Sequence, residues 1–368
     1  MAVSPAKPGG PGLIGLDIDA GQIHMCQIRP REPGLYTIIA KISISYSGSR
    51  KDLLASPKRL KALIRAGLKE KNFKGKRVAA LIPWDDVNIL LLTYKATVDD
   101  VDAEVLRMLD KRVEGAIEDY VVDYVPVRSN PSAEEHMMVA TVSRRDKVDA
   151  LLQALIDADL EVDSLDIAPT ALRRIVSALY TGHAADNVLM INCYHDDSYL
   201  TVISGRRFLL NQSVPFGERM LLERIARELD ITIESALNLV LNNGFQKHQT
   251  LALGSTDGEP DIPSTLLEIV KPCFLELVEE INRILLLTAA ETHGLPVSRV
   301  CLLGSIARWP GAQQVLLSLL DFDAPDGQIE FTQVFEDEND NTRVPWSGLF
   351  SDISIAMGLA LQGLIGNE

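Results

Sequence analysis

Two short turns of the chain carry residue types that could bind a phosphate group and its metal ion. The first turn contains Asp17, Asp19 and Gly21, and the second, much later in the chain, contains Asn192. A carboxylate at such a turn can hold the water molecules around Mg²⁺, and glycine lets backbone N–H groups approach phosphate oxygens. The other members of this candidate nucleotide cleft are two glycines and a hydroxyl residue, Gly217, Gly304 and Ser305.

Two similar sets of strands are needed to bring these turns together. The first set is expected at Leu13–Ile18, Gln22–Ile28 and Tyr36–Ser45. The second set is expected at Val188–Cys193, Tyr199–Ile203 and Phe208–Val214. Both have the apolar runs and turns of a three-stranded meander, and they align when Asp17 is laid on Asn192. A chain that builds one meander twice is expected to form two similar lobes, and a cleft between lobes is a common ligand site.

Helices and strands alternate through the rest of the chain. Thr97 is a candidate N-cap for a helix over Val98–Ala116, and Pro272 is expected to interrupt a long helix over Ser264–His293. A glycine-containing apolar helix is expected over Ser354–Ile365. The acidic stretch Asp321–Asn341 is interpreted as a solvated loop, with a docking surface as the alternative.

Composition excludes several classes of protein. The chain has 368 residues, with 36 Lys and Arg against 51 Asp and Glu, so its formal net charge is −15. This acidity argues against binding to nucleic acid or to anionic lipid. Its four cysteines are far apart, without a CxxC pair, which is typical of a reducing compartment. Apolar runs such as Ile284–Leu287 are far shorter than the ~20 residues of a membrane-spanning helix, so we expect a cytoplasmic protein that meets the membrane through a partner.

Five stretches together resemble a known family, the actin-like PilM family of type IV pilus assembly proteins, relatives of the cell-division protein FtsA. They are Ile117–Val127, His136–Ile175, Ser213–Ala236, Val300–Gln313 and Ile355–Gly363. The resemblance extends over nearly the whole chain from Leu13. It implies an α/β, actin-like (ribonuclease H-like, duplicated) fold of two lobes, with a small α/β subdomain inserted in the first lobe.

The expected organisation follows from this resemblance. Residues 1–12 form a flexible tail, and residues 13–87 and 162–185 form the first lobe. Residues 88–161 form the inserted subdomain. Residues 186–368 form the second lobe, with a helical insertion at about 221–270.

The resemblance also implies a partner and a location. Family members lie at the cytoplasmic face of the inner membrane, bind ATP in many cases, and couple the membrane platform to pilus motor ATPases. They hold the cytoplasmic N-terminal peptide of a single-pass membrane protein, PilN, in a groove at the inserted subdomain. Here Tyr94, Tyr120 and Tyr124 could wall such a groove, or they could simply form the core of the subdomain.

The nucleotide cleft departs from the family pattern at every segment that can be compared. Asp19 replaces a glycine beside the phosphate position, and Asn192 and Tyr194 replace the aspartate and glycine of the second turn. Like charges ~4 Å apart repel by ~1 kcal/mol in water and by several times more in a cleft. The further departures are Asp196 and Asp197, Glu218 after Gly217, Leu222 at a threonine position, Leu239-Val240 at a lysine position, and Ile306 where the nucleoside needs space. We therefore expect a pseudo-ATPase scaffold that binds neither ATP nor Mg²⁺ with useful affinity.

Other interpretations remain open at this stage. One is an ATP-binding switch of the same family, and another is an FtsA-like filament former or a sugar-kinase-like ATPase. An FtsA-like anchor would need a basic amphipathic C-terminal helix, whereas this chain ends in Gly366-Asn367-Glu368. His195-Asp196-Asp197 could hold a metal ion but is better explained as a hairpin turn, and Cys26 and Cys193 are expected to be small buried side chains.

Overall fold

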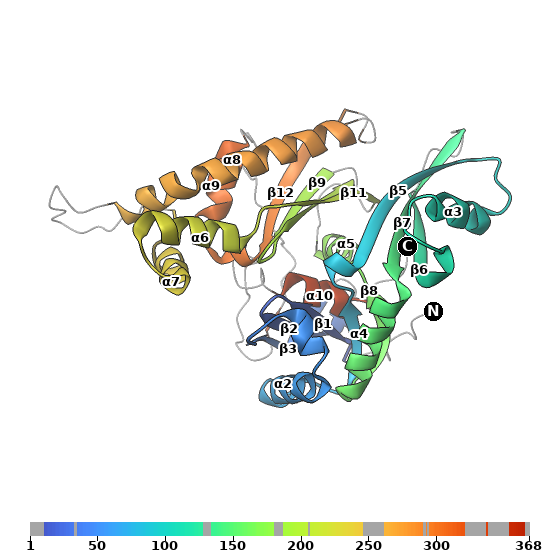
Figure 1. Ribbon diagram of the computed structural model, residues 1–368, viewed down its shortest axis with the longest axis horizontal. Helices are drawn as coiled ribbons and strands as arrows, with labels where there is room; N and C mark the ends of the chain where they lie inside the picture. The colour runs from blue at the N-terminus through green and yellow to red at the C-terminus, as the bar shows by residue number, and fades with distance from the viewer. Residues whose placement is uncertain are drawn as a thin grey trace.

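Three β-sheets organise the chain (Figure 1). The computed structural model describes residues 11–32, 35–127, 134–179, 187–204, 207–245, 261–289, 292, 294–320, 336–337 and 353–364. Of the expected tail, only residues 11–12 lie within these ranges, and of the expected acidic loop only residues 336–337 do. No helix within the described ranges is long and apolar enough to cross a lipid bilayer.

The first lobe is built on a six-stranded sheet with the order β13-β3-β2-β1-β4-β8. Its strands are β1 (Ile14–Asp19), β2 (Gln22–Glu32), β3 (Leu35–Ser45), β4 (Arg77–Leu81), β8 (Glu161–Asp166) and β13 (Glu336–Asp337). Strands β1, β2 and β3 form an antiparallel meander, and β4 lies parallel to β1. Both faces of β1 are buried, so Leu16 and Asp17 point into different layers of the protein.

Helices α1 (Arg50–Leu54), α2 (Pro57–Glu70) and α4 (Arg145–Asp157) belong to the first lobe. Buried residues Leu60 of α2 and Leu151 and Leu155 of α4 share one apolar core with Ile14 of β1. Helix α4 falls inside the range 88–161 expected for the inserted subdomain. Because its buried face joins the core of the six-stranded sheet, we place α4 with the first lobe and end the inserted unit at β7.

The second lobe repeats the same arrangement on a four-stranded sheet with the order β11-β10-β9-β12. Its strands are β9 (Asn187–Cys193), β10 (Ser198–Ser204), β11 (Arg207–Val214) and β12 (Val297–Gly304). Strands β9, β10 and β11 form an antiparallel meander, and β12 lies parallel to β9. The predicted duplication of the meander is confirmed. Helices α6 (Glu218–Leu229), α7 (Ile233–Asn243), α8 (Ile262–Thr288) and α9 (Ala312–Leu319) pack on this lobe.

Helix α8 runs without a break through Pro272, so the predicted interruption is wrong. Proline removes one backbone N–H and crowds the preceding turn, which usually kinks or ends a helix. Here Pro272 lies on the exposed side, while Val270, Cys273 and Phe274 are buried against the second lobe. Burial of the apolar stripe on both sides of the proline outweighs the missing hydrogen bond.

Helices α5 (Ala168–Leu179) and α10 (Ser354–Ala360) lie between the two lobes (Figure 1). They share one apolar core with both sheets, through residues such as Ile28 of the first sheet and Met190 of the second. A side chain on Gly358 would clash with the backbone of Ala171, so the two helices need glycine to pack this closely. The closing helix is shorter than the predicted Ser354–Ile365.

A third sheet, with the order β5-β7-β6, forms a small unit of its own. Its elements are β5 (Val87–Lys95), β6 (Tyr120–Val127), β7 (Glu135–Arg144) and helix α3 (Val101–Asp110). Buried Leu92 and Met138 of the sheet pack with Val105 and Leu109 of α3.

Helix α3 differs from the prediction at both ends. It begins after Asp100, whose carboxylate accepts a hydrogen bond from the N–H of Ala103 at 3.0 Å, so Asp100 and not Thr97 is the N-cap. It ends at Asp110 and not at Ala116, and Gly115 then takes a positive φ of 96°.

Candidate functional site

The two predicted turns face each other across the space between the lobes. Asp17 and Asn192 are almost fully buried, and they occupy matching positions on β1 and β9. Asp19 at the end of β1 is close enough to Asp196 of the β9–β10 turn and to Glu218 of α6 to be affected by their charges. The cleft therefore holds Asp17 and Asp19 from the first turn and Asn192 from the second, and their part in a nucleotide site stays a prediction.

The carboxyl groups at the end of β1 resist ionisation. Burial, followed by the charge of Asp19, raises the pKa of Asp17 well above its usual value. The pKa of Asp19 is raised to about 7, chiefly by burial and also by the charges of Asp196 and Glu218, while a backbone hydrogen bond from Ala20 and the charge of Arg50 act in the opposite direction. A triphosphate brought here would add anionic charge to carboxylates that already resist ionisation.

The glycines expected to receive a nucleotide are packed against the chain itself. A side chain on Gly217 would clash with the carbonyl group of Asp196, and one on Gly304 would clash with the carbonyl group of Cys193. The hydroxyl of Ser305, which begins the short 3₁₀ helix η3 (Ser305–Arg308), donates to the same Cys193 oxygen at 3.2 Å. The close approach that glycine permits is thus used for contacts between strands and turns.

At Gly21, unlike Gly217 and Gly304, an added side chain would have free space around it. Its φ is +82°, and the nearest atom to an added side chain would be the carbonyl oxygen of Tyr46 at 4.0 Å. Its role is to allow the tight β1–β2 turn, since few other residues adopt this conformation.

Tyr194 fills the space where the second turn would carry a glycine. Its side chain is buried, and its pKa is raised well above the usual value by burial and then by Asp17 and Asp19. Its ring lies edge-on to Trp84, with centroids 6.0 Å apart. Trp84 belongs to the 3₁₀ helix η1 (Trp84–Asp86) that follows β4, so this contact joins the first lobe to the second.

Ile306, expected to take space that a nucleoside needs, lies in the interior of the second lobe. Its side chain is fully buried in the core of the second lobe, in the cluster that also holds Trp309. Leu222 and Val240 lie in the same core. These three departures from the family pattern therefore lie in the core of the second lobe.

Glu218 is held firmly by its own lobe. Its carboxylate accepts hydrogen bonds from Arg308 at 2.8 Å and from the indole N–H of Trp309 at 3.2 Å. The Arg308 charge and, above all, burial lower the pKa of His24 to about 4, so that histidine is neutral at pH 7. The ring of His24 contacts the hydroxyl of Ser43 at 2.8 Å.

The segment His195-Asp196-Asp197 forms the β9–β10 turn. The carbonyl of Asp197 accepts from the N–H of Tyr194, and the carbonyl of His195 accepts from the N–H of Arg219. In the part of the chain that the structure describes, no group of three or more His, Cys, Asp or Glu residues is placed to hold a metal ion. All four cysteines are buried and unbridged.

Four buried polar atoms at this cleft have no hydrogen-bond partner of ordinary geometry within the described ranges. They are Asp17 Oδ1, Trp84 Nε1, Asn192 Nδ2 and the Tyr194 hydroxyl. Buried polar groups are normally satisfied by protein or ordered water. Here they are one carboxylate oxygen and three hydrogen-bond donors, and they lie in the same cleft as Asp19.

Sequence reasoning missed three residues of this cleft: Trp84, Tyr199 and Arg50. Trp84 and Tyr199 stack with their ring centroids 3.4 Å apart. Arg50 forms an ion pair with Asp85 and supplies the positive charge nearest to the carboxylates Asp17 and Asp19. The only available signal was Pro83-Trp84 at the end of a buried strand, which does not reveal a partner in another lobe.

The three tyrosines of the inserted subdomain lie on the sheet face that α3 covers. Tyr120 is buried, and its hydroxyl donates to the carbonyl of Glu114 at 2.8 Å. Tyr124 donates to the Asp102 carboxylate of α3, and this hydrogen bond raises the pKa of Tyr124 to about 12. Tyr94 lies near His136, with ring centroids 5.7 Å apart. Their role in binding a partner stays a prediction.

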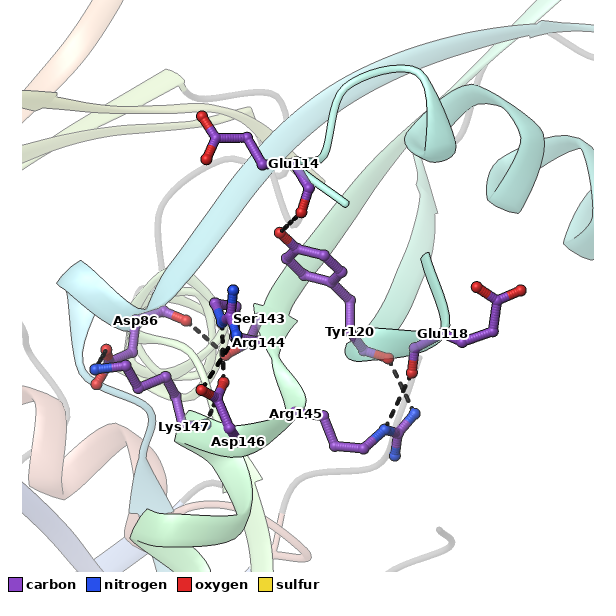
Figure 2. Close-up of polar contacts among 9 residues, drawn as sticks. All are labelled: Asp86, Glu114, Glu118, Tyr120, Ser143, Arg144, Arg145, Asp146 and Lys147. Atoms are coloured by element: carbon purple, nitrogen blue, oxygen red, sulfur yellow. Dashed lines mark hydrogen bonds and ion pairs between the residues drawn. The ribbon is translucent and has the colours of Figure 1, made fainter. Parts of the chain in front are cut away.

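Polar contacts fasten the inserted sheet to the first lobe (Figure 2). Arg145 at the start of α4 donates to the backbone carbonyls of Glu118 and Tyr120, at 3.3 and 3.0 Å. Ser143 at the end of β7 donates to the carbonyl of Asp86, and Lys147 lies 3.7 Å from the Asp86 carboxylate. The helix η1 therefore meets both the cleft, through Trp84, and the base of the inserted sheet, through Asp86.

Comparisons with known proteins agree with this architecture. One similar structure is a PilM-PilN type IV pilus biogenesis complex, with a TM-score of 0.74 and 17% sequence identity, covering 96% of this chain and 99% of that chain. Another is the ethanolamine utilization protein EutJ from Carboxydothermus hydrogenoformans, with a TM-score of 0.53, 14% identity, and coverage of 96% and 92%. They show the fold: it is the two-lobed, actin-like α/β fold that the resemblance implied.

The comparison of sequences is more specific. No curated protein matches the chain. The family model for type IV pilus assembly protein PilM matches residues 15–364, which is almost the entire sequence. The chain therefore belongs to the PilM family of type IV pilus assembly proteins.

Proposed function

We propose that this protein is a scaffold of a type IV pilus or related secretion platform, that it works by protein–protein contact, and that its cleft does not bind ATP usefully. The observation that carries this proposal is the packing of Gly217 and Gly304 against the chain's own carbonyl groups. Tyr194 and the carboxylates of Asp17 and Asp19 support it. A cleft built in this way keeps the two-lobed shape without a triphosphate.

The partner in this proposal is the cytoplasmic N-terminal peptide of a PilN-like inner-membrane protein. A similar solved structure is a PilM-PilN complex, and the family match extends over both lobes. Binding such a peptide would hold the protein at the cytoplasmic face of the inner membrane. Contact with pilus motor ATPases follows from the same family role.

The inserted subdomain offers features that suit such a peptide. Segments next to a membrane span on the cytoplasmic side are rich in Lys and Arg. Exposed Asp99, Asp100 and Asp102 lie at the start of α3, beside half-buried Tyr94 and Tyr124. Strands β5 and β6 are the edges of their sheet and pair with no other described strand, so an extended peptide could add to either edge.

Nucleotide binding can be tested by thermal unfolding. A ligand at ~100 times its Kd stabilises a protein by ~2.7 kcal/mol, which raises the unfolding temperature measurably. We expect no shift with millimolar ATP and Mg²⁺. A clear upward shift would contradict the scaffold proposal and favour the nucleotide-dependent switch.

Partner binding can be tested by calorimetric titration with the N-terminal peptide of the neighbouring PilN-like protein, with a scrambled peptide as control. We expect the same Kd with and without Mg-ATP. The change Tyr94→Ala should weaken binding about tenfold, which is typical of an aromatic contact residue. The matched control is Leu286→Ala, a change at a well-exposed side chain of α8 in the other lobe, and it should leave the Kd unchanged.

A further inference from the structure

We propose that an aromatic latch, made of Trp84, Tyr194 and Tyr199, holds the two lobes closed in the absence of any nucleotide. Trp84 comes from the first lobe, and the two tyrosines come from the β9–β10 hairpin of the second lobe. In a protein whose lobes close around a ligand, the ligand holds the lobes together. Here the latch would hold them together instead.

The three rings contact one another in both of the geometries that aromatic pairs favour. Trp84 and Tyr199 are stacked, with centroids 3.4 Å apart and an interplanar angle of 13°. Tyr194 lies edge-on to both, at 6.0 Å from Trp84 and 5.9 Å from Tyr199. Stacked and edge-to-face pairs stabilise a structure beyond the area that they bury, so the cluster favours the closed arrangement.

Both halves of the latch are anchored in their own lobes. Trp84 follows β4 directly in η1, where neighbouring Asp85 is paired with Arg50 of α1. Tyr194 donates its N–H to the carbonyl of Asp197 at 2.9 Å, and its own carbonyl accepts from the N–H of Glu218 at 3.1 Å. Moving either lobe would therefore move its rings and separate the stack.

The charges across the cleft oppose closure. Asp19 of the first lobe meets the like charges of Asp196 and Glu218 of the second lobe, and these raise its pKa after the larger effect of burial. The three rings belong to the apolar core that α5 and α10 share with both sheets, and they form its part beside the cleft.

The latch can be measured as a distance between the lobes. Spin labels would be placed on Lys58→Cys of α2 and Glu234→Cys of α7, both exposed sites, one in each lobe. The native cysteines are buried, so the labels attach to the introduced ones. In the nucleotide-free protein we expect a single narrow distance distribution. In Trp84→Ala and Tyr199→Ala it should broaden and move to longer distances.

Matched variants separate the latch from general damage to the fold. Tyr199→Phe keeps the ring, and Tyr124→Ala removes a tyrosine that does not cross the cleft, so both should keep the narrow distribution. An unchanged distribution in folded Trp84→Ala protein would overturn the proposal. If the alanine variants do not fold, Trp84→Leu and Tyr199→Leu keep apolar volume without a stack, and the same broadening is expected.

The latch proposal rests on the proposed function in one respect, namely that no nucleotide fills the cleft. Different experimental results would contradict the latch and the proposed function. The distance measurement uses neither ATP nor partner peptide, so it reads the latch alone. If Mg-ATP raises the unfolding temperature, the scaffold proposal fails. If the lobes are already apart in the unmodified, nucleotide-free protein, the latch fails whatever ATP does.

Discussion

Buried carboxylates are the residues that most distinguish this cleft. Asp17 and Asp19 lie at the end of a buried strand, and Asp19 is affected by charges from both lobes. An acid whose pKa is raised on folding holds its proton longer in the folded state than in the unfolded chain. Such a group destabilises the folded protein as pH rises.

Asp19→Asn should therefore change the pH dependence of stability. The ordinary pKa of 3.8 is raised to about 7 in the folded protein, mainly by burial. The free energy of unfolding should fall as pH rises from about 4 to about 7, by about 2–4 kcal/mol from Asp19. The variant should be more stable than the parent at pH 8 and show a flatter profile in urea unfolding at pH 5, 6, 7 and 8. The control Asp149→Asn, at an exposed site on α4, should show the same change of unfolding free energy with pH as the parent. If Asp19→Asn also showed the parent's pH dependence, the raised pKa of Asp19 would be contradicted.

Gly304→Ala tests whether the glycine serves the chain's own packing. The added methyl group would clash with the carbonyl of Cys193 at a φ of +80°, so the free energy of unfolding should fall by about 3 kcal/mol or more. Gly75→Ala is a matched control, because Gly75 has a φ of +78° and no atom within 4 Å of the added carbon. It should cost only about 1 kcal/mol in the same denaturation experiment. An equal loss of unfolding free energy in the two variants would show that Gly304 is needed for its backbone conformation and not for its close packing.

At the scale of elements, short segments do most to connect the parts of the molecule. The helix η1 has three residues, and each has a different partner: Trp84 stacks on Tyr199, Asp85 pairs with Arg50, and Asp86 accepts from Ser143. A longer connection could bend between these contacts. This short helix instead fixes the cleft, the first lobe and the inserted sheet relative to one another.

The start of α3 gives a test at this scale. Asp100→Ala should lower the free energy of unfolding of the inserted subdomain by about 1 kcal/mol, because the carboxylate caps the N–H of Ala103. Thr97→Ala should have little effect, since α3 does not begin there. Hydrogen exchange of the amides in the first turn of α3 measures both changes. Greater exchange in Thr97→Ala than in Asp100→Ala would mean that the helix begins earlier in solution.

At the scale of the whole molecule, the two lobes share a core, whereas the inserted subdomain has its own. Helices α5 and α10 bury apolar side chains against both large sheets. The inserted sheet packs with α3 in a separate cluster. The lobes should therefore lose structure together, and the inserted sheet can loosen independently.

Two core substitutions should separate these units. Ile175→Ala in α5 and Leu109→Ala in α3 each remove a fully buried aliphatic side chain, at a cost of about 2–5 kcal/mol. Hydrogen exchange should rise in strands of both lobes for Ile175→Ala. For Leu109→Ala it should rise in β5, β6 and β7 alone. A rise in only one lobe for Ile175→Ala would contradict the shared core.

The sequence by itself determined the duplicated meanders, most helices and strands, the family, and the acidic and aromatic departures in the cleft. The meanders, helices and strands depend on periodicity and residue type, which are local properties, whereas the family and the departures in the cleft came from the resemblance to known sequences. Asp19, Asn192 and Tyr194 could be identified because their positions within a strand and turn are evident from the chain alone.

Only the tertiary structure decided which segments cover one another. It placed Ile306 in a core, brought Trp84 against Tyr199, assigned α4 to the first lobe, and packed Gly217 and Gly304 against backbone carbonyls. A hydrophobic pattern shows that a face must be buried, but it does not identify the distant surface that buries it. That choice depends on packing among all the elements at once, and the same packing keeps α8 continuous through Pro272.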